Sequence, residues 1–290
     1  MGSEATTDTD FVQFWNSVLE PKFTKYRHIL QGGLSRHSAA VLPRLPIRKG
    51  MAVLDVGCGW GDMSIQVAEL VGPAGRVLGI DCVDAFLSEA RKDAAARGFS
   101  NVEFSRGDAE IALPENAFDY VVARFGTMFF ANPVAALRRM RLALRPGGLI
   151  SHIVWRRRED NPAWQAPRDI TLRHLPPPAE DADSCGPGPF SMANQEAVGL
   201  MMKSAGFTDI TFSRVDEKIM IGTGVAECIE FALAIGPGGE VFRAAGPALA
   251  EAKRPAIERD MREFFESQER DARGIWSPTS SWVISARNPD

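Results

Sequence analysis

The sequence predicts an α/β fold in which a mainly parallel sheet is covered by helices on both faces. Strand-like and helix-like segments alternate between Val53 and Trp155, which is the pattern of repeated β-α-β units. The apolar strand Val53–Val56 also runs through a glycine-rich turn straight into a helix. With 290 residues, of which 45% are hydrophobic and 24% charged, the chain can bury a large core without disulfides.

Start and stop signals define the elements of this first half. Asp84 is a good N-cap for a helix that Gly98 would end, and Pro133 opens a helix that Pro146-Gly147-Gly148 would stop. The expected strands are, in order, 53–56, 76–81, 102–105, 118–123 and 149–155, and the helices between them are 63–70, 85–96 and 133–144.

The second half of the chain has a different pattern. Three consecutive prolines at Pro176 to Pro178 and the run Gly186-Pro187-Gly188-Pro189 predict a long loop over 157–192. After this loop we expect a helix at 194–204, a strand at 210–221, two or three helices within 225–271 interrupted at Gly236-Pro237-Gly238-Gly239, and a last strand at 276–286. Residues 11–45 form a helical prelude rich in aromatic side chains. We predict one domain over 1–290, with a cap built from 11–45, 157–192 and 223–272.

Composition excludes several classes of protein. Lys and Arg total 33 against 37 Asp and Glu, and this net charge of -4 lacks the basic footprint of a nucleic-acid-binding protein. The four cysteines, Cys58, Cys82, Cys185 and Cys228, form no CxxC pair, so we expect free thiols in a reducing compartment and no metal site. No run of 18 apolar residues and no signal peptide is visible, so we expect a cytoplasmic protein without a membrane span.

The glycine turn carries the first functional signal. Glycines at 57, 59 and 61 let the backbone turn sharply and approach a ligand, and the helix that follows presents its free N–H groups there. Asp81 ends the next strand, where a carboxylate can accept hydrogen bonds from ribose hydroxyls, and Asp108 ends the third. All three features lie at the carboxyl ends of adjacent parallel strands, where open α/β sheets bind ligands.

Several motifs in order resemble one family. The run Asp55-Val56-Gly57-Cys58-Gly59-Trp60-Gly61, the acid at 81, Gly107-Asp108-Ala109-Glu110 and Leu144-Arg145-Pro146-Gly147-Gly148 look like the class I S-adenosylmethionine-dependent methyltransferases, most closely the small-molecule enzymes of ubiquinone-biosynthesis type. The resemblance covers about residues 50–156. It implies a Rossmann-like, doubly wound sheet of seven strands, the last antiparallel, with 50–156 as the cofactor-binding core, 11–45 as a lid and 223–272 as a helical cap inserted between the last two strands.

The resemblance also implies a cofactor site for S-adenosyl-L-methionine. Asp55 and the backbone of Gly57 to Gly61 would hold the methionine part, and Asp81 would take the ribose hydroxyls. Asp108 would accept a hydrogen bond from the adenine amino group, and the backbone N–H of Ala109 would meet the adenine ring. Glu110 belongs to the same motif. The remaining residues expected at this site are Gly57, Cys58, Gly59 and Gly61 in the turn, Cys82 against the adenine, and Arg124 beside the methionine group. Arg124 could instead form an ion pair, and the two cysteines could be buried hydrophobes.

The methyl acceptor would be a small organic molecule. Phe125, Met128 and Phe129 follow the fourth strand and could wall its pocket or simply pack in the core, and Trp155 borders the same opening. Histidines are the other candidates: His28 and His37 lie beside Tyr26 in the prelude, and His152 in the fifth strand could face the pocket or be a core residue. An activated acceptor needs no base, so the sequence assigns no catalytic residue.

Two other functions remain open from the sequence. A nicotinamide-dependent oxidoreductase uses a related fold, but its G-x-G-x-x-G turn differs from the G-x-G-x-G spacing here. A non-catalytic module could keep the cofactor site and lack an acceptor. The sequence also allows a homodimer.

Overall fold

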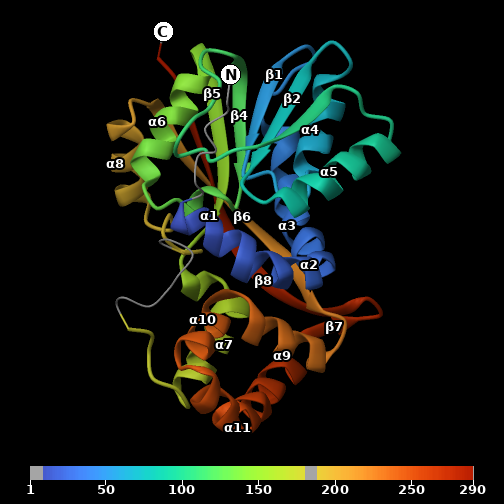
Figure 1. Ribbon diagram of the computed structural model, residues 1–290, viewed down its shortest axis with the longest axis vertical. Helices are drawn as coiled ribbons and strands as arrows, with labels where there is room; N and C mark the ends of the chain where they lie inside the picture. Colours follow the sequence, from blue (N-terminus) through green and yellow to red (C-terminus); the bar gives the residue numbers. More distant parts are fainter. Residues whose placement is uncertain (1–8, 180–187, 290) are drawn as a thin grey trace, which may run out of the picture.

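The computed structural model describes residues 9–179 and 188–289 and contains an eight-stranded sheet with helices on both faces (Figure 1). Seven strands lie in the order β3-β2-β1-β4-β5-β8-β6, and the short β7 pairs with β8. Their bounds are β1 Ala52–Val56, β2 Arg76–Asp81, β3 Val102–Arg106, β4 Phe118–Arg124, β5 Leu144–Trp155, β6 Thr208–Gly222, β7 Glu269–Asp271 and β8 Gly274–Arg287.

Strand direction matches the expected fold. β1 pairs in parallel with β2 and β4, and the same holds for β2 with β3 and β4 with β5. β8 is antiparallel to both of its long neighbours, β5 and β6. The prediction of a Rossmann-like sheet with an antiparallel last strand is therefore confirmed, and β7 is a short addition that the sequence pattern did not reveal.

Alternation along β1 explains why both faces are covered. Val53 packs in one buried cluster, with Met63 and Leu87 of the helices after β1 and β2. The next residue, Leu54, packs in a second and larger cluster on the other face. Successive side chains of a strand point to opposite faces, so a strand that is buried at every position needs helices on both sides.

The helices fall into three groups. Flanking the sheet are α4 Asp62–Val71, α5 Asp84–Ala96, α6 Pro133–Ala143 and α8 Gln195–Ser204. The N-terminal group crosses between the sheet and the lower lobe in Figure 1 and contains α1 Asp10–Phe14, the π-helix η1 Trp15–Leu19, α2 Glu20–Lys25, α3 Arg27–Val41 and the short η2 Leu42–Arg44. The lower lobe contains α7 Pro162–Leu172, α9 Val225–Ala234, α10 Gly236–Ala244 and α11 Pro247–Glu266. Two further short turns are η3 Thr127–Phe129 and η4 Arg158–Asp160.

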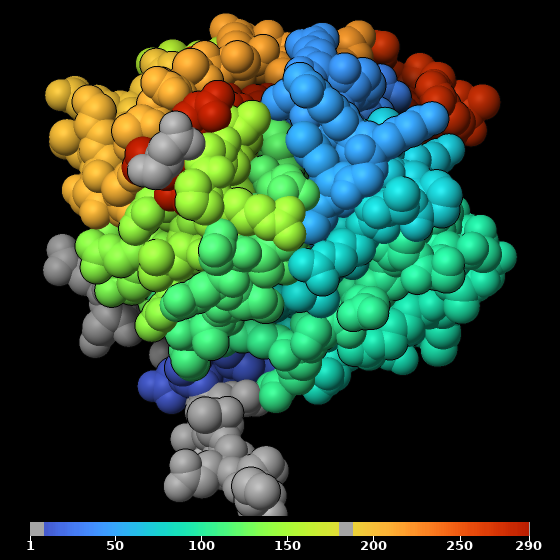
Figure 2. Space-filling model, turned by 90° about the horizontal axis from the view of Figure 1, so that it is seen from above, coloured from blue at the N-terminus to red at the C-terminus, as the bar shows by residue number. Residues whose placement is uncertain are grey.

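Two long strands connect the sheet to the lower lobe. β6 and β8 run past the end of the other strands, and α9, α10 and α11 lie between them in the chain (Figure 1). Figure 2 shows the molecule from above, at the end opposite the lower lobe. There the segments coloured blue to green, which carry β1 to β5 and their helices, lie side by side.

One prediction from the proline pattern was wrong. The segment 157–192 is not all loop, because α7 begins at Pro162 and buries Trp164 and Ile170. A proline at the first helical position lacks only an N–H that would be unpaired there anyway, so it does not prevent a helix. The glycine run at 236 lies where the helices are interrupted, as predicted, because α9 ends at Ala234 and α10 begins at Gly236. Cys185 and Gly186-Pro187 lie outside the described residues. Within the described ranges, no helix is both long and apolar enough to cross a membrane.

Candidate functional site

The glycine turn after β1 has the backbone shape that only glycine adopts readily. Gly57, Gly59 and Gly61 have φ values of 69°, 53° and 74°. A Cβ on Gly61 would clash with Phe104 at 2.6 Å, so this glycine permits packing of the turn against the sheet. A Cβ on Gly59 would meet nothing within 4 Å, because this residue borders a cavity. The turn is therefore packed on one side and open to a ligand on the other.

Asp81 ties this turn to the end of β2. Its Oδ2 accepts a hydrogen bond from the Gly59 N–H at 2.8 Å, and its Oδ1 accepts from the Val83 N–H at 3.0 Å. Burial raises the pKa of Asp81, while these backbone donors act in the opposite direction. The carboxylate thus stabilises the turn and still borders the cavity. Its remaining lone pairs can accept hydrogen bonds from a ligand there.

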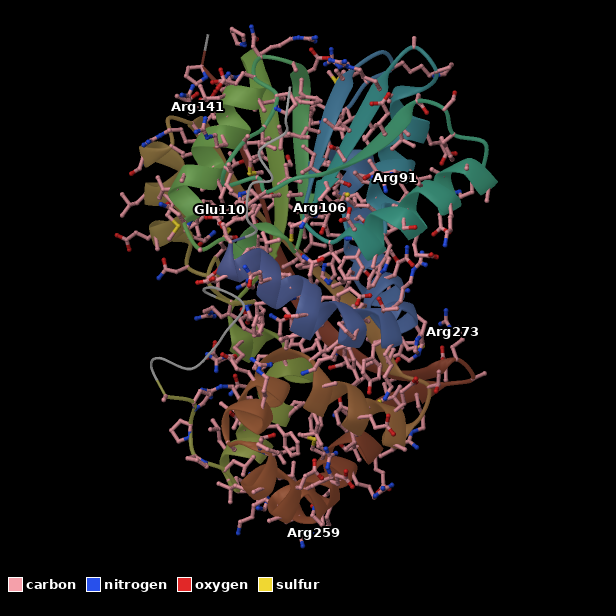
Figure 3. All side chains as sticks on the ribbon, in the orientation of Figure 1. Arg91, Arg106, Glu110, Arg141, Arg259 and Arg273 are labelled. Atoms are coloured by element: carbon pink, nitrogen blue, oxygen red, sulfur yellow. The ribbon has the colours of Figure 1, made fainter. Side chains whose placement is uncertain are left out.

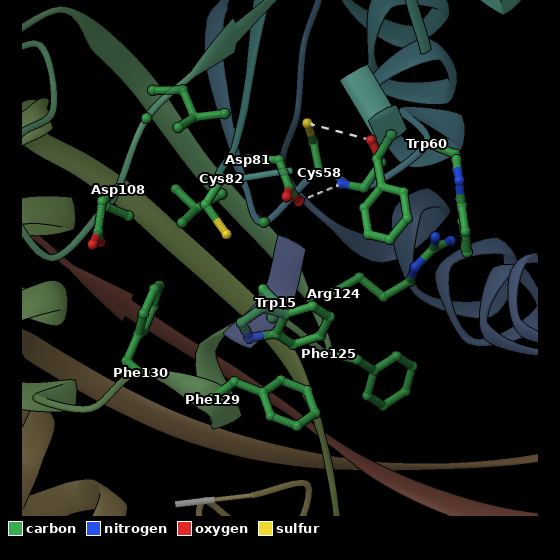
Figure 4. Close-up of a pocket in the computed structure, with 18 of the residues that line it drawn as sticks. Trp15, Cys58, Trp60, Asp81, Cys82, Asp108, Arg124, Phe125, Phe129 and Phe130 are labelled. Atoms are coloured by element: carbon green, nitrogen blue, oxygen red, sulfur yellow. Dashed lines mark hydrogen bonds between the residues drawn. The ribbon is translucent and has the colours of Figure 1, made fainter. Parts of the chain in front are cut away.

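The cavity beside this turn has an empty volume of about 930 Å³ and lies at the carboxyl ends of the strands (Figure 4). Its polar lining includes Asp81, Asp108 and Arg124. Aromatic rings from the N-terminal helices close the opposite side, where Trp15 packs edge-on against Phe129 with ring centroids 5.3 Å apart. We call this space the first cavity. It combines hydrogen-bonding groups along the strand ends with an apolar wall on the opposite side.

Arg124 is held by an acid at the start of α4. Its two terminal nitrogens donate to the two carboxylate oxygens of Asp62, both at 2.7 Å, and one also donates to the Ser38 hydroxyl. The side chains of Arg124 and Asp62 are only 9% and 13% exposed. The ion-pair alternative considered for Arg124 is therefore present, although the residue also lines the first cavity.

Phe125 separates the first cavity from a second. This non-glycine residue has φ 57°, a strained conformation that proteins retain mostly at functional sites. Its ring stacks on Trp155 with centroids 4.0 Å apart. Phe23, Leu34, Phe125 and Phe129 line both cavities, so the two spaces adjoin.

The second cavity lies between the N-terminal helices and the lower lobe and has an empty volume of about 790 Å³. Its lining is almost entirely apolar, and among the described residues the charged side chains that line it are Glu240 and Arg243, both on α10. From the described part of the chain, the lining is Leu19, Phe23, Leu30, Leu34, Phe125, Met128, Phe129, Trp155, Trp164, Pro189, Ala234, Ile235, Gly236, Pro237, Glu240 and Arg243. A pocket of this size and polarity suits a small, mostly apolar molecule.

Most of the residues expected to hold a cofactor meet at the first cavity. Those that line it are Gly57, Cys58, Gly59, Asp81, Cys82, Asp108, Ala109 and Arg124. Burial raises the pKa of the Cys58 and Cys82 thiols well above their usual range, so both stay neutral. They therefore act as small apolar side chains, the alternative that the sequence had left open.

Three residues expected to hold the cofactor do not line the first cavity. Asp55 is completely buried beneath the turn, where its Oδ2 accepts from the Ser64 hydroxyl at 2.6 Å. Gly61 faces Phe104, as described above. Glu110 turns away to accept the N–H groups of Ala131 and Asn132 just before α6 (Figure 3). Each of these three has a structural partner that accounts for its position.

The aromatic candidates for the acceptor site lie at the second cavity, and the polar ones do not. Phe125, Met128, Phe129 and Trp155 line it. Tyr26 is buried against Phe231 of α9, and the half-exposed His28 pairs with Glu227. His37 is buried and bonded to Thr279 and Ser281. His152 is buried, and its Nδ1 is hydrogen-bonded to the Thr127 hydroxyl.

Burial also removes the two interior histidines as proton acceptors at neutral pH. It lowers the pKa of both His37 and His152 to about 4, with a further contribution from Arg124 at His37. Neither ring borders a described cavity. Among the described residues, no cluster of three or more His, Cys, Asp or Glu side chains is arranged to hold a metal ion.

Comparison with known proteins finds relatives of the part of the chain that carries most of the sheet. A family model described as a methyltransferase domain matches residues 47–177. Demethylmenaquinone methyltransferase of Geobacillus stearothermophilus is 37% identical over 110 residues, which cover 38% of this chain and 47% of that protein. Residues 47–177 carry a methyltransferase domain.

Other relatives agree with this domain assignment. Demethylmenaquinone methyltransferase of Listeria monocytogenes is 36% identical over 132 residues, which cover 45% of this chain and 55% of that protein. The chain thus spans about half the length of the curated relatives it matches. Among solved structures, phosphoethanolamine N-methyltransferase 2 of Haemonchus contortus, in complex with S-adenosyl-L-methionine, shares the fold of the methyltransferase domain with a TM-score of 0.58 and 18% identity, covering 98% of this chain and 61% of that one.

The methyltransferase domain provides the strand ends, but sequence reasoning missed several residues that border the cavities. Phe11, Trp15 and Phe23, from before this domain, close the first cavity. The second is lined by Trp164, inside the domain, and by Glu240 and Arg243, which follow it. The aromatic richness of the prelude was the available signal for the first group. Trp164 was hidden in a segment interpreted as loop, and no local pattern marks Glu240.

Proposed function

We propose that this protein transfers a methyl group from S-adenosyl-L-methionine to a small, mostly apolar acceptor. The observation that supports this most directly is the pair of adjoining cavities, one at the strand ends of the methyltransferase domain and one between the N-terminal helices and the lower lobe. Methyl transfer needs donor and acceptor to meet in line with water excluded. Two spaces that share an aromatic wall meet that need.

The residues of the first cavity fit the cofactor chemically. Asp81 would accept hydrogen bonds from the ribose, and the open backbone at Gly59 leaves room for a ligand to approach closely. Asp108 and Ala109 would hold the adenine. The cofactor supplies an electrophilic methyl group on a sulfonium, which carries its own leaving group.

The second cavity would position the acceptor rather than activate it chemically. Phe125 and Phe129 form the wall shared with the first cavity, and neither they nor Phe23 and Leu34 can accept a proton. We therefore propose that rate acceleration comes from alignment and from exclusion of water by the rings around Trp15. An acceptor whose reacting atom is already nucleophilic fits such a site.

The acceptor named for the curated relatives is demethylmenaquinone. We propose the same general class, a small organic molecule bound through apolar contact, for this chain. The absence of a nucleic-acid partner, a cytoplasmic location and a homodimer stay predictions from the sequence. The division into a lid at 11–45, a core at 50–156 and a cap at 223–272 is also part of this proposal.

Calorimetric titration tests the cofactor half of the proposal. S-adenosylhomocysteine should bind one site per chain, and Gly59→Val should abolish binding, because the added side chain enters the first cavity and φ 53° disfavours it. Glu263→Leu on the exposed face of α11 serves as the control and should bind normally. Tight binding of a nicotinamide dinucleotide with none of S-adenosylhomocysteine would favour the oxidoreductase alternative. Cofactor binding without methyl transfer to any apolar acceptor would favour a non-catalytic module.

A further inference from the structure

The second cavity adjoins an open groove between α2 and the lower lobe. This groove has an empty volume of about 1130 Å³, and its charged lining includes Lys22 and Lys25 of α2, Glu230 of α9 and Arg243 of α10. We call it the outer groove. Ala234 and Arg243 line both spaces, whereas no residue of the first cavity lines the outer groove. Arg243 therefore lies where the second cavity meets the outer groove, at the end away from the cofactor site.

The acids of the outer groove already have cations. Lys25 forms an ion pair with Glu230 at 3.1 Å. Arg254 of α11 pairs with Glu251 at 2.8 Å and with Glu258 at 3.2 Å. These three acids are the ones that line the groove within the described ranges. Their charges are therefore compensated without the other cations of the groove.

Lys22 lacks such a partner. Its side chain is half-buried, and no described residue forms a hydrogen bond or an ion pair with its ammonium group. Burial lowers the pKa of Lys22, and the positive charge of Arg243 lowers it further. Two neighbouring cations repel each other, and partial burial weakens the solvation that would offset this repulsion. An anion bound between them would compensate both charges.

Arg243 faces the same side as Lys22. Its guanidinium lies over the Phe14 ring of α1 at 5.5 Å, and its charge acts on Lys22. A planar guanidinium can donate two parallel hydrogen bonds to a carboxylate or a phosphate, and a lysine ammonium adds a compact charge beside it. The two side chains together therefore suit an oxyanion.

Glu240, one helical turn before Arg243, does not oppose this arrangement. It lines the second cavity but not the outer groove. Its negative charge raises the pKa of Arg168 on α7, and it is not among the groups that act on Lys22. A ligand anion on the Lys22 side of Arg243 thus meets positive charge, while Glu240 is balanced by a cation of the lower lobe.

We propose that the methyl acceptor carries an anionic group, a carboxylate or a phosphate, at its end remote from the reacting atom, and that Lys22 and Arg243 bind this group where the second cavity meets the outer groove. This inference rests on the proposed function and narrows the acceptor to an apolar compound with a distal negative charge. The apolar part fills the second cavity, and the charged end extends past Arg243 toward Lys22. Both residues determine specificity and take no part in the transfer itself.

Binding of matched probes to the protein saturated with S-adenosylhomocysteine tests this inference. Phenylalkanoates from 3-phenylpropionate to 8-phenyloctanoate vary the distance between an apolar ring and a carboxylate, and calorimetry finds the length that binds best. At that length the carboxylate should bind about tenfold more tightly than its neutral primary amide, the gain expected for a hydrogen bond between charged groups. The alkanoate without the ring should bind about tenfold more weakly than the phenylalkanoate, because it leaves the second cavity unfilled.

Variants of the three cations separate a binding site from general attraction. Lys22→Met keeps the length of the side chain but removes its charge, and it should bring the carboxylate and the amide to within about threefold of each other. Arg243→Met should act in the same direction, and Lys22→Arg should keep the preference. Lys25→Met is the matched control. It removes one positive charge from the same groove, but Glu230 already neutralises that charge, so the preference should be unchanged.

The outcomes distinguish this inference from the proposed function. If S-adenosylhomocysteine binds but wild type prefers the carboxylate over the amide at no chain length, the anionic assignment is overturned and the methyltransferase proposal stands. If S-adenosylhomocysteine fails to bind at all, the proposed function itself fails. The affinity of each variant for S-adenosylhomocysteine should equal that of wild type, which shows that the variant is folded.

Two further results would also overturn the inference. An equal loss of preference in Lys22→Met and Lys25→Met would show that the overall charge of the groove attracts the probe without a defined site. Equal affinity for the phenylalkanoate and for the alkanoate without its ring would show a site for a free anion, separate from the acceptor.

Discussion

Arg124 at the end of β4 and Asp62 at the start of α4 form a doubly hydrogen-bonded ion pair beside the first cavity. Both side chains are nearly buried, so each charge depends on the other for compensation. The pair fixes the helix that follows the glycine turn to the strand that precedes Phe125. It therefore joins the two loops that border the cofactor site.

Removing one partner of this pair should be costly. Arg124→Met leaves the Asp62 carboxylate buried without a counter-charge, and we expect the free energy of unfolding to fall by about 3–5 kcal/mol. Arg124→Met combined with Asp62→Leu should lose less than the sum of the single changes. Urea unfolding followed by circular dichroism measures both. Arg214→Met, which breaks an ion pair with side chains 53% and 55% exposed, is the control and should leave the free energy of unfolding almost unchanged, because exposed ion pairs contribute little.

Asp81 should affect both cofactor affinity and stability. The sequence alone predicts that Asp81→Ala weakens cofactor binding roughly a hundredfold, from two lost hydrogen bonds to ribose. The structure adds a stability cost, because the same carboxylate accepts from Gly59 and Val83. We expect a loss of about 1–2 kcal/mol in the free energy of unfolding, comparable to loss of a helix cap.

Calorimetry with S-adenosylhomocysteine and urea unfolding of Asp81→Ala measure the two effects separately. A variant that is destabilised yet binds the cofactor product within threefold of wild type would show that Asp81 only supports the turn.

Acid should destabilise the protein through its two buried histidines. The pKa of His37 and of His152 is about 4 in the folded chain against 6.5 for an ordinary histidine. Between these values the unfolded chain binds more protons, so stability is full above pH 6.5 and falls as the pH drops toward 4. Each histidine contributes on the order of 3 kcal/mol across this window.

Asp55 acts in the opposite sense and must be considered in the same measurement. Burial raises the pKa of Asp55 to about 7, against 3.8 for an ordinary aspartate. Between pH 7 and pH 3.8 the folded chain therefore binds a proton at Asp55 that the unfolded chain does not. This difference makes the folded state more stable as the pH falls from 7 toward 3.8. Unfolding of wild type, His37→Gln and His152→Gln from pH 4.5 to 7.5 isolates the histidines. Each variant should show a smaller loss on acidification, and a profile parallel to that of wild type would contradict the assignment.

The N-terminal helices should become protected when the cofactor site is filled. Trp15 and Phe23 line the first cavity, and Asn16 holds the π-helix to the site by donating to the Cys82 carbonyl at 3.1 Å. Hydrogen exchange should slow in residues 10–25 on adding S-adenosylhomocysteine, because a lid over a ligand opens less often. Helix α8, which packs on α6 and β6 and lines neither cavity, should change little and serves as the internal reference. Equal exchange of residues 10–25 with and without the ligand would reject the lid.

Gly236 should control the size of the second cavity. It has φ 78°, and a Cβ there would approach the Trp164 ring at 2.9 Å. We expect Gly236→Ala to raise KM for an apolar acceptor several-fold while the affinity for S-adenosylhomocysteine stays unchanged. Steady-state kinetics and calorimetry test the two halves of this statement, and a parallel loss of both affinities would indicate general disruption instead.

The sequence by itself determined where β1 to β5 lie in the chain, their parallel direction and the position of the glycine turn. These features depend on short-range patterns: apolar strands of four to seven residues, glycines at 57, 59 and 61, and an acid at the end of the next strand. Parallel strands then bring their carboxyl ends to one edge, so Asp81 and the turn meet without further information. The antiparallel last strand followed from the family resemblance and agrees with the structure.

Only the tertiary structure decided which side chains line the two cavities opposite the strand ends. Trp15, Trp164 and Glu240 are far apart in the chain and converge because the N-terminal helices and the lower lobe pack against the same strand ends. No local period encodes such a contact, since it depends on how whole helices dock. The same reason explains why the sequence placed His37 wrongly at the acceptor site. Its ring is buried and hydrogen-bonded to Thr279 and Ser281, which lie more than 240 residues away in the chain.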